Sequence, residues 1–321
     1  MLLVVAGAAV WAPAPRLKYA ERAEMLNSIH FLLTYACNFE CDHCFLFCGP
    51  GSKGTFTIHQ LRSALDAAAE VGGIESVFFE GGEPMLFFPL LAEGIREACR
   101  RGFKVGIVTN SYWGTSAEDA ALWMRPLREA GLTSVTISDD PLHYGDAAGA
   151  HAQRIQDAAK DLGMHVDVLC KQRPSVQPAG ADDAGEPAIA GGVKFRGRAV
   201  RKLLAGLPTR PWEQLARCPF ENLAQPQRVH ADCYGHLHLC QGISMGNFWE
   251  SPLRHVVRNY DPQAHPIAGP LLRGGPAQLA RELDVPHEGQ YVDECHMCFE
   301  LRLALMKRFP GLLCPPQVYG L

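Results

Sequence analysis

The sequence has no excess of charge of either sign and little charge overall. Lys and Arg total 30 residues against 34 Asp and Glu, so the net charge is −4, and charged residues make up 20% of the chain. Without a strongly basic composition, neither nucleic acid nor an anionic membrane surface is an expected partner. The length of 321 residues and the 47% apolar content are ordinary for a globular protein with one large domain, or with one domain and a smaller module.

A long apolar run that could cross a bilayer is also missing. Residues 1–15 are apolar and rich in alanine, but they are too short to span a membrane and lack the basic start of a signal peptide. We therefore predict a dispensable N-terminal extension over residues 1–27 and no membrane partner.

Cysteine, in contrast, is abundant, with 12 residues. A chain of this size and apolar content does not need disulfides, and several cysteines lie two or three residues apart, too close to stabilise a fold by cross-linking. Thiolates at such spacing are suited to sharing a metal. The pattern predicts metal ligation in a reducing, cytoplasmic environment.

Short apolar runs alternate with helical stretches from residue 29 to about residue 198. The runs are nearly continuous, which is typical of parallel strands covered by helices. They are Ile29–Ala36, Ser76–Glu80, Lys104–Thr109, Ser134–Ser138, His165–Lys171 and Val193–Gly197. The alternation predicts an α/β fold with a parallel sheet. Six strands are too few for a closed eight-stranded barrel and favour a partial (β/α)6 TIM-like barrel, with its chemistry at the carboxyl ends of the strands.

The helices between these strands have recognisable ends. Thr57 is an expected N-cap, and Gly72 with the next glycine is expected to end that helix. Ser116 and Asp119 approximate a capping box for the helix after the third strand. The segment Arg173–Gly192 is rich in Pro, Ala, Gly and Asp and is predicted to be a loop.

Three cysteines follow the first predicted strand directly, in the stretch Cys37-Asn-Phe-Glu-Cys41-Asp-His-Cys44. Three thiolates can hold three irons of a cubane and leave the fourth iron open. The spacing C-x3-C-x2-C in this position resembles the radical S-adenosylmethionine (SAM) superfamily. The resemblance implies a [4Fe–4S] cluster that binds SAM and cleaves it to a 5′-deoxyadenosyl radical. The alternative is a zinc site with Cys48 or His43 as fourth ligand; otherwise Cys48 is a bystander.

The same resemblance assigns SAM-binding residues at the ends of later strands. Phe79-Glu80-Gly81-Gly82-Glu83-Pro84 looks like the family's Gly-Gly-Glu motif, in which the glycines approach the methionine moiety and Glu83 receives its ammonium. Ser138 and Asp140 stand where the family contacts the SAM ribose, and His43 where an aromatic residue stacks near the adenine. The predicted SAM-binding residues are His43, Gly81, Gly82, Glu83, Asn110, Ser138 and Asp140.

A second group of cysteines lies beyond residue 211, where the strand–helix alternation ends. Cys218, the unit Gly235-x4-Cys240 and the stretch Cys295-His-Met-Cys298 resemble the Twitch module, the short relative of the SPASM domain. Gly235 marks a hairpin turn that puts Cys240 at the end of a strand. The resemblance implies an auxiliary [4Fe–4S] cluster on four thiolates with no open iron.

Three alternatives for the second group stay open. A zinc site could use the same four thiolates, Cys233 could replace Cys218, and Cys314 could join Cys295 and Cys298 as in the molybdenum-cofactor cyclases. The predicted organisation is an extension over 1–27, a radical SAM partial barrel over 28–210 and an auxiliary-cluster module over 211–321.

The resemblance leaves the substrate undetermined. The first hypothesis is an oxidative radical SAM enzyme that abstracts hydrogen from a peptide or small biosynthetic intermediate, with the auxiliary cluster receiving an electron and a flavodoxin or ferredoxin as reductant. A Twitch-type dehydrogenase of a sugar or cyclitol alcohol is the second. A non-catalytic, cysteine-rich metal-binding scaffold is the third. No residue is assigned as catalytic base.

Overall fold

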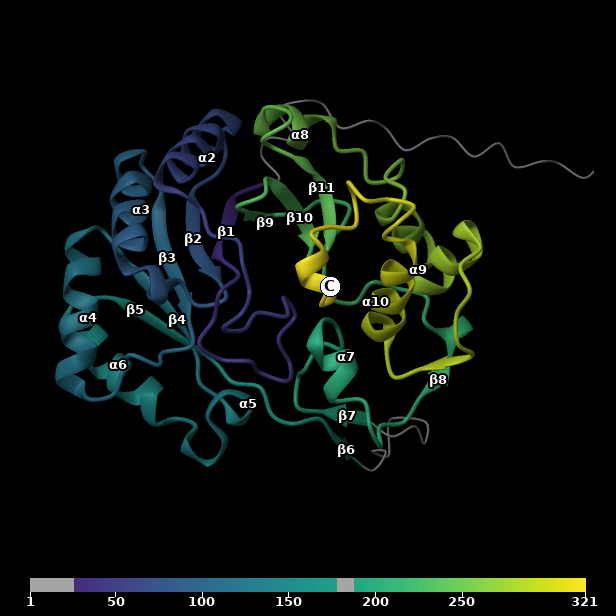
Figure 1. Ribbon diagram of the computed structural model, residues 1–321, viewed down its shortest axis with the longest axis horizontal. Coiled ribbons are helices and arrows are strands. Elements are labelled where there is room, and N and C mark those ends of the chain that lie inside the picture. The colour runs from purple at the N-terminus through teal and green to yellow at the C-terminus, as the bar shows by residue number, and fades with distance from the viewer. Residues whose placement is uncertain (1–25, 178–187) are drawn as a thin grey trace, which may run out of the picture.

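The computed structural model describes residues 26–177 and 188–321, so the predicted extension over 1–27 lies almost entirely outside the described residues. Eight strands form one sheet in the order β11-β10-β9-β1-β2-β3-β4-β5 (Figure 1). The five strands β1 to β5 run parallel, as the predicted α/β fold requires. They are β1 (Ser28–Thr34), β2 (Ser76–Gly81), β3 (Lys104–Thr109), β4 (Ser134–Ser138) and β5 (His165–Leu169).

Helices on one face of the sheet connect these strands (Figure 1). They are α2 (Ile58–Val71), α3 (Phe88–Arg100), α4 (Ala117–Glu129) and α6 (Ala150–Asp161), with the short α5 (Pro141–Tyr144) after β4. The predicted helix ends are confirmed: Thr57 caps α2 in a capping box, Gly72 follows its last residue, and the Ser116 side chain accepts from the backbone N–H of Asp119.

Successive residues of β1 face opposite sides of the sheet, as the pleat of a strand requires. Ile29, Phe31 and Leu33 are buried in the apolar core beneath the helices, which also contains Leu61 and Leu65 of α2. Leu32 belongs to a second core on the other side of the sheet, together with residues near the C-terminus. The side chains of β1 that are not covered by helices therefore point toward the C-terminal part of the chain.

The expected sixth strand at 193–197 is not formed, so the six-stranded (β/α)6 unit is wrong in that form. Phe195 packs into a small separate apolar cluster, and the guanidinium of Arg196 bonds Glu221 and Cys240. These side-chain contacts hold the segment as a connection into α7 (Arg198–Lys202). The predicted loop at 173–192 contains, in its described part, the short antiparallel pair β6 (Ser175–Gln177) and β7 (Ala188–Ala190).

Three C-terminal strands extend the sheet on the other edge of β1. β9 (Arg228–Asp232) pairs with β1 in parallel, and β10 (His236–Cys240) and β11 (Ile243–Asn247) follow as antiparallel strands. The hairpin turn expected at Gly235 is confirmed, with φ of 91°. One sheet therefore continues across the predicted boundary at residue 210.

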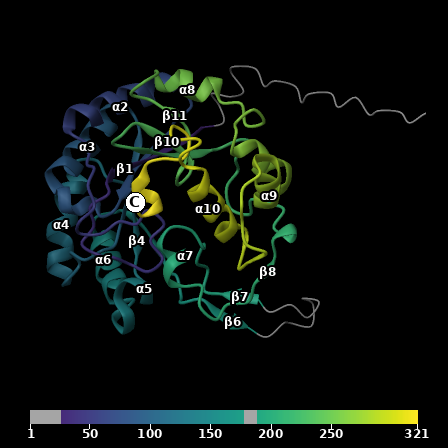
Figure 2. The ribbon, with the colours of Figure 1, turned by 45° about the vertical axis from the view of Figure 1, so that its right-hand side comes forward.

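α8 (Leu253–Asn259) lies on the α2 side of the sheet, because its Leu253, Val256 and Val257 belong to the apolar core that also contains residues of α2. The remaining elements lie on the side of the sheet away from α2–α6 (Figure 1). They are α9 (Ala268–Leu283), α10 (Glu294–Leu305), and the pair β8 (Arg210–Pro211) and β12 (Gln290–Tyr291). The C-terminal end lies between the sheet and α10 in both views (Figures 1 and 2), where Gln317 donates to the carbonyl oxygens of Leu46 and Phe47. Among the described residues, no helix combines the length and apolarity needed to cross a bilayer.

Candidate functional site: two groups of cysteines

The first cysteine group lies on the loop that leaves the carboxyl end of β1. Cys37 is buried, and Cys41 and Cys44 are partly exposed. The loop is closed by backbone hydrogen bonds from Cys37 to Gly49 (3.2 Å) and from Cys44 to Cys41 (3.1 Å). The predicted bystander Cys48 packs against this group, because its backbone N–H lies 3.3 Å from the Cys44 sulfur.

Arg198, the first residue of α7, holds this loop in place. Its side chain is 8% exposed and donates to the carbonyl oxygens of Cys41 (2.8 Å) and Cys48 (2.7 Å). The Arg198 backbone N–H donates to the carbonyl oxygen of Cys44 as well. Charge-assisted bonds of this kind are the strong class of protein hydrogen bonds. Arg198 lies 150 residues or more from these partners and belongs to no motif, so the sequence alone does not indicate it.

The two glycines of the Gly-Gly-Glu motif let the end of β2 approach the cysteine loop. A Cβ at Gly81, where φ is 130°, would lie 2.2 Å from the Thr34 carbonyl oxygen, and one at Gly82 would lie 2.1 Å from that of Ala36. The Gly82 N–H donates to Thr34, and the Glu83 N–H to Ala36. The glycines are therefore required by the contact between β2 and the cysteine loop, a reason that the sequence analysis did not give.

Glu83 is fully buried and its carboxylate joins the ends of β2 and β3. It accepts from the Thr109 hydroxyl (2.8 Å) and from the backbone N–H groups of Asn110 (2.7 Å) and Met85 (3.0 Å). Burial raises the pKa of Glu83 to about 7. The side-chain amide of Asn110 in turn lies 3.7 Å from the Cys37 sulfur. Glu83 and Asn110 thus lie directly behind the first cysteine.

His43 and Asp140 also meet at this site. Their side chains are 3.9 Å apart, and the His143 ring lies against His43 with 4.8 Å between ring centroids. Asp140 accepts from the backbone of Leu142 and from His143 Nδ1. Burial alone would raise the pKa of Asp140, but the bond from His143 and the nearby histidines outweigh it and lower the pKa. Ser138 ends β4 two residues earlier.

The second group of cysteines lines one pocket on the opposite side of the sheet from α2–α6. Cys240 ends β10, and Cys295 and Cys298 lie three residues apart in the first turns of α10. The pocket is lined by these three, by Cys218, by the arginines 196, 217 and 302, and by apolar residues that include Leu223, Ile243 and Leu271. All four cysteines predicted for the second site are therefore brought together.

Two arginines accompany these sulfurs. The Arg196 guanidinium lies 2.9 Å from the Cys240 sulfur and bonds Glu221 at the same distance. Arg302 is 2% exposed and donates to the carbonyl oxygen of Gln241 at 2.8 Å. Buried positive charge beside these cysteines favours their deprotonated, thiolate form.

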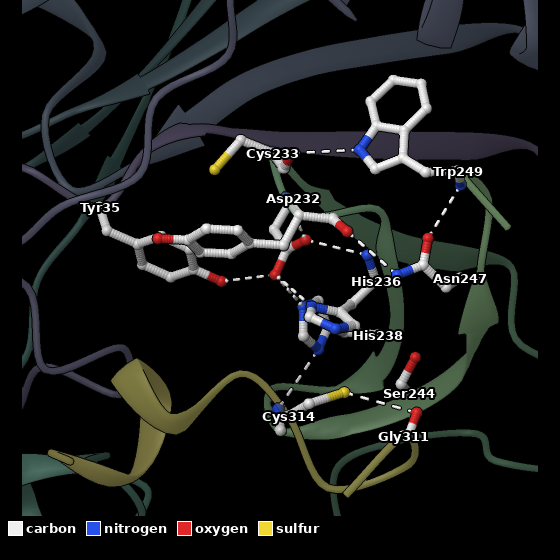
Figure 3. Close-up of polar contacts among 12 residues, drawn as sticks. Tyr35, Asp232, Cys233, His236, His238, Ser244, Asn247, Trp249, Gly311 and Cys314 are labelled. Atoms are coloured by element: carbon white, nitrogen blue, oxygen red, sulfur yellow. Dashed lines mark hydrogen bonds and ion pairs between the residues drawn. The ribbon is translucent and has the colours of Figure 1, made fainter.

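The alternative ligands Cys233 and Cys314 are not among the residues that line this pocket. Figure 3 shows Cys233 beside Asp232, and Cys314 on the far side of His238 from the Asp232 carboxylate. The carbonyl oxygen of Cys233 accepts from Trp249 Nε1, and the Cys314 thiol donates to the carbonyl oxygen of Gly311 (Figure 3).

Three close groups of metal-ligand side chains occur among residues 26–177 and 188–321, each with donor atoms within 4.8 Å of one another. None of the three includes a cysteine sulfur.

Comparison with known proteins gives one family and several partial relatives. Residues 31–140 match the Radical SAM superfamily. The Bacillus subtilis protein YydG, named for peptide biosynthesis, is 25% identical over 36% of this chain and 37% of its own length. The Pyrococcus furiosus tungsten-containing aldehyde ferredoxin oxidoreductase cofactor-modifying protein is 29% identical over 44% of this chain and 41% of its own. The chain thus spans less than half the length of these curated relatives.

The solved structures found are similar only at low identity. The structure of BtrN in complex with AdoMet and 2-DOIA has a TM-score of 0.42 and 15% identity, and the match covers 73% of this chain and 82% of that one. The structure of Streptococcus suis SuiB bound to the precursor peptide SuiA has a TM-score of 0.43 and 12% identity. That match covers 74% of this chain and 65% of the SuiB chain.

Proposed function

We propose that this chain, which matches the Radical SAM superfamily over residues 31–140, cleaves SAM reductively and abstracts hydrogen from a peptide or a small biosynthetic intermediate. Membership of that superfamily implies a [4Fe–4S] cluster and SAM. We assign the cluster to Cys37, Cys41 and Cys44, three thiolates that leave one iron free of protein ligands. When bound, the cluster and SAM supply a 5′-deoxyadenosyl radical as the hydrogen-abstracting species.

The observation that carries this proposal is the placement of the three cysteines on one tightly held loop at the carboxyl end of β1. Arg198 and the β2 glycines fix the loop from two sides, through bonds to Cys41 and Cys48 and close approaches at Thr34 and Ala36. A loop fixed in this way presents its sulfurs without further ordering when a cluster binds, which lowers the entropic cost of binding.

We assign SAM to the polar residues that surround this loop. Gly81 and Gly82 keep the end of β2 free of side chains, and Glu83 and Asn110 lie next to Cys37. Asp140 and His43 lie on another side of the loop. Together with Ser138 these groups offer carboxylate, amide and hydroxyl partners for the ammonium and ribose hydroxyls of SAM. Burial lowers the pKa of His43 to about 4, which keeps its ring neutral for stacking.

We assign an auxiliary [4Fe–4S] cluster to Cys218, Cys240, Cys295 and Cys298. The apolar lining of the pocket excludes water, and Arg196 and Arg302 place positive charge beside the thiolates. Four thiolates complete the coordination of a cubane, so such a cluster serves electron transfer and does not bind SAM. This arrangement supports a net oxidation, in which the cluster accepts an electron from the substrate radical.

A peptide is the substrate class that the named relatives favour. YydG is named for peptide biosynthesis, and a third relative, AlbA of Bacillus subtilis, for biosynthesis of the bacteriocin subtilosin. The partial-barrel domain over 28–210 and the auxiliary module over 211–321 belong to the same proposal.

Measuring 5′-deoxyadenosine tests this proposal. The reconstituted protein is reduced with dithionite in the presence of SAM, beside the variants Cys37→Ala and Cys99→Ala. Cys99 lies on α3 and belongs to neither cysteine group; its thiol donates to the carbonyl oxygen of Gly131, and it serves as the control. We expect deoxyadenosine from the wild type and from C99A and none from C37A. Undiminished cleavage by C37A, or none by an iron-loaded wild type, would contradict the proposal.

A further inference from the structure

A third group of metal-ligand side chains lies on the sheet itself and contains no cysteine. His30 on β1 is directly opposite His230 on β9 and opposite Phe78 on β2. Glu80 is two residues beyond Phe78, so it points to the same face of the sheet as both histidines. This face is the one not covered by α2–α6, since the neighbouring residue Leu32 also packs on that side.

The three side chains lie close together on this face of the sheet. Glu80 Oε1 lies 2.8 Å from His230 Nε2 and 3.4 Å from His30 Nδ1. Nevertheless, Glu80 Oε1 and His30 Nδ1 are both buried without a hydrogen-bond partner. At a separation of 2.8 Å this means that the N–H direction does not point at the oxygen. The three donor atoms lie within 4.8 Å of one another, close enough to be ligands of one ion.

Gln241, directly after β10, adds a fourth polar group. Its side-chain nitrogen lies 3.3 Å from both ring nitrogens of His230, and its Oε1 is buried without a partner. The two ends of an amide are interchangeable in such assignments. Rotating the amide by half a turn places its oxygen, which can act as a metal ligand, next to His230. Three of the six unpartnered buried side-chain atoms in the described residues thus belong to this one group.

The other two close groups of metal-ligand side chains do not combine several unsatisfied buried atoms in this way. Asp232, His236 and His238 satisfy one another, and Asp232 also accepts from the Tyr35 hydroxyl (Figure 3). His43, Asp140 and His143 belong to the site assigned to SAM above. Only the group on β1, β2 and β9 combines convergent donors with several unsatisfied atoms, and unsatisfied buried polar atoms are rare in folded proteins.

We propose that His30, Glu80 and His230 bind one divalent first-row transition-metal ion, with the Gln241 side-chain oxygen as a further donor. Two imidazoles and one carboxylate form a ligand set that suits zinc or ferrous iron. Ligands at 2.0–2.2 Å around one ion lie about 3–3.5 Å apart, close to the two separations measured here. Glu80 immediately precedes Gly81, at the end of β2 beside the first cysteine group. Gln241 immediately follows Cys240, at the end of β10 in the second group. The ion would therefore connect the two strand ends that support the two cysteine groups.

Zinc binding to the protein with both clusters already loaded tests this site, because the cysteines are then occupied by iron. We expect one zinc per chain after gel filtration, and a zinc X-ray absorption spectrum with nitrogen and oxygen at 2.0–2.1 Å and no sulfur at 2.3 Å. The variants His30→Gln, Glu80→Gln and His230→Gln should each weaken zinc binding by at least about tenfold. His165→Gln, an exposed histidine on β5, is the control and should bind like the wild type.

Loss of a ligand could also disturb folding, so thermal stability provides a second measurement. An ion that binds only the folded state raises the melting temperature. Added zinc should raise the melting temperature of the wild type and of H165Q. It should leave the melting temperatures of the three ligand variants unchanged. A sulfur shell in the zinc spectrum, no zinc on the cluster-loaded wild type, or unchanged binding by the ligand variants would each overturn the proposal. Iron content and deoxyadenosine formation are separate readouts, so the failure of this site leaves the proposed function untouched.

Discussion

The guanidinium of Arg196 lies 2.9 Å from the sulfur of Cys240. Arg196 belongs to the connection into α7, whereas Cys240 ends a strand that joined the sheet from the C-terminal part of the chain. Glu221 bonds the same Arg196 nitrogen at 2.9 Å and holds it in place. A buried cation from outside the cysteine motif thus contacts one of the proposed cluster ligands.

This contact predicts the redox behaviour of the second site. A nearby positive charge and an N–H···S bond both stabilise the reduced state of a cluster. Replacing Arg196 by Gln removes both of these interactions. We expect R196Q to lower the midpoint potential of the auxiliary cluster, measured by anaerobic redox titration followed by electron paramagnetic resonance. The cluster on Cys37, Cys41 and Cys44 is the internal control. Lys194→Gln, which removes a half-exposed charge 3.8 Å from Glu221, should have a smaller effect. An unchanged potential in R196Q would contradict this assignment.

The glycines of β2 predict a steric effect. In Gly82→Ala the new methyl would lie 2.1 Å from a backbone oxygen of Ala36, which cannot move without displacing the cysteine loop. We expect the free energy of unfolding to fall by at least about 2 kcal/mol and SAM binding to weaken. Gly51→Ala is the matched control, because a methyl there meets nothing within 4 Å. Denaturant unfolding and SAM titration measure both effects, and equal stability of G82A and G51A would refute the prediction.

The hydrogen bonds of Arg198 predict that stability and cluster loading depend on one side chain. Arg198→Gln leaves the carbonyl oxygens of Cys41 and Cys48 without their donor, and we expect a loss of about 2–4 kcal/mol in unfolding free energy. Iron uptake at the first site should fall in parallel. Arg201→Gln, on the same helix, removes one bond from an exposed arginine to Tyr319 and should cost less than about 1 kcal/mol. Equal effects in the two variants would show that the loop does not depend on Arg198.

His236 predicts a pH dependence of stability. Burial alone would lower the pKa of His236, but its bonds to Asp232 and Cys314 outweigh this and raise the pKa to about 10. A histidine whose pKa is higher in the folded state than in the unfolded state stabilises the protein fully below about pH 6.5, and this contribution is lost as the pH rises toward 10. The melting temperature of the wild type should therefore fall between pH 7 and pH 9.5.

The variant His236→Gln should show a smaller fall over the same range, because it has no proton to lose. His165→Gln, whose side chain is 69% exposed, should behave like the wild type. Identical pH profiles for H236Q and the wild type would mean that this histidine does not titrate with folding.

The parallel part of the fold could be predicted because its signal is local. The runs at 104–109 and 134–138 match β3 and β4 residue for residue, and the caps at Thr57 and Ser116 lie where the sequence puts them. The sixth strand could not be predicted correctly. The run at 193–197 has the composition of a strand, but Arg196 is bound by Glu221 and Cys240, which lie far away in the sequence. The pairing of β1 with β9 links residues about 200 apart, and no local pattern indicates it.

In the candidate sites, too, the residues with a local sequence pattern could be predicted and those that act from a distance could not. The spacing of the cysteines indicated which sulfurs gather in the first loop and in the second pocket. Residues that support them from a distance, such as Arg198 and Arg302, have no motif. The group His30, Glu80 and His230 combines residues from three strands, and only the register of the sheet brings them together.

Counting iron in cysteine variants tests the central claim, two separate four-iron sites, most directly. After anaerobic reconstitution, iron and acid-labile sulfide are measured in the wild type, in the triple variant Cys37→Ala/Cys41→Ala/Cys44→Ala and in the double variant Cys295→Ala/Cys298→Ala. We expect about eight irons per wild-type chain and about four in each variant, with deoxyadenosine formation lost in the triple variant. Zinc in place of iron, or equal iron in all three proteins, would contradict it.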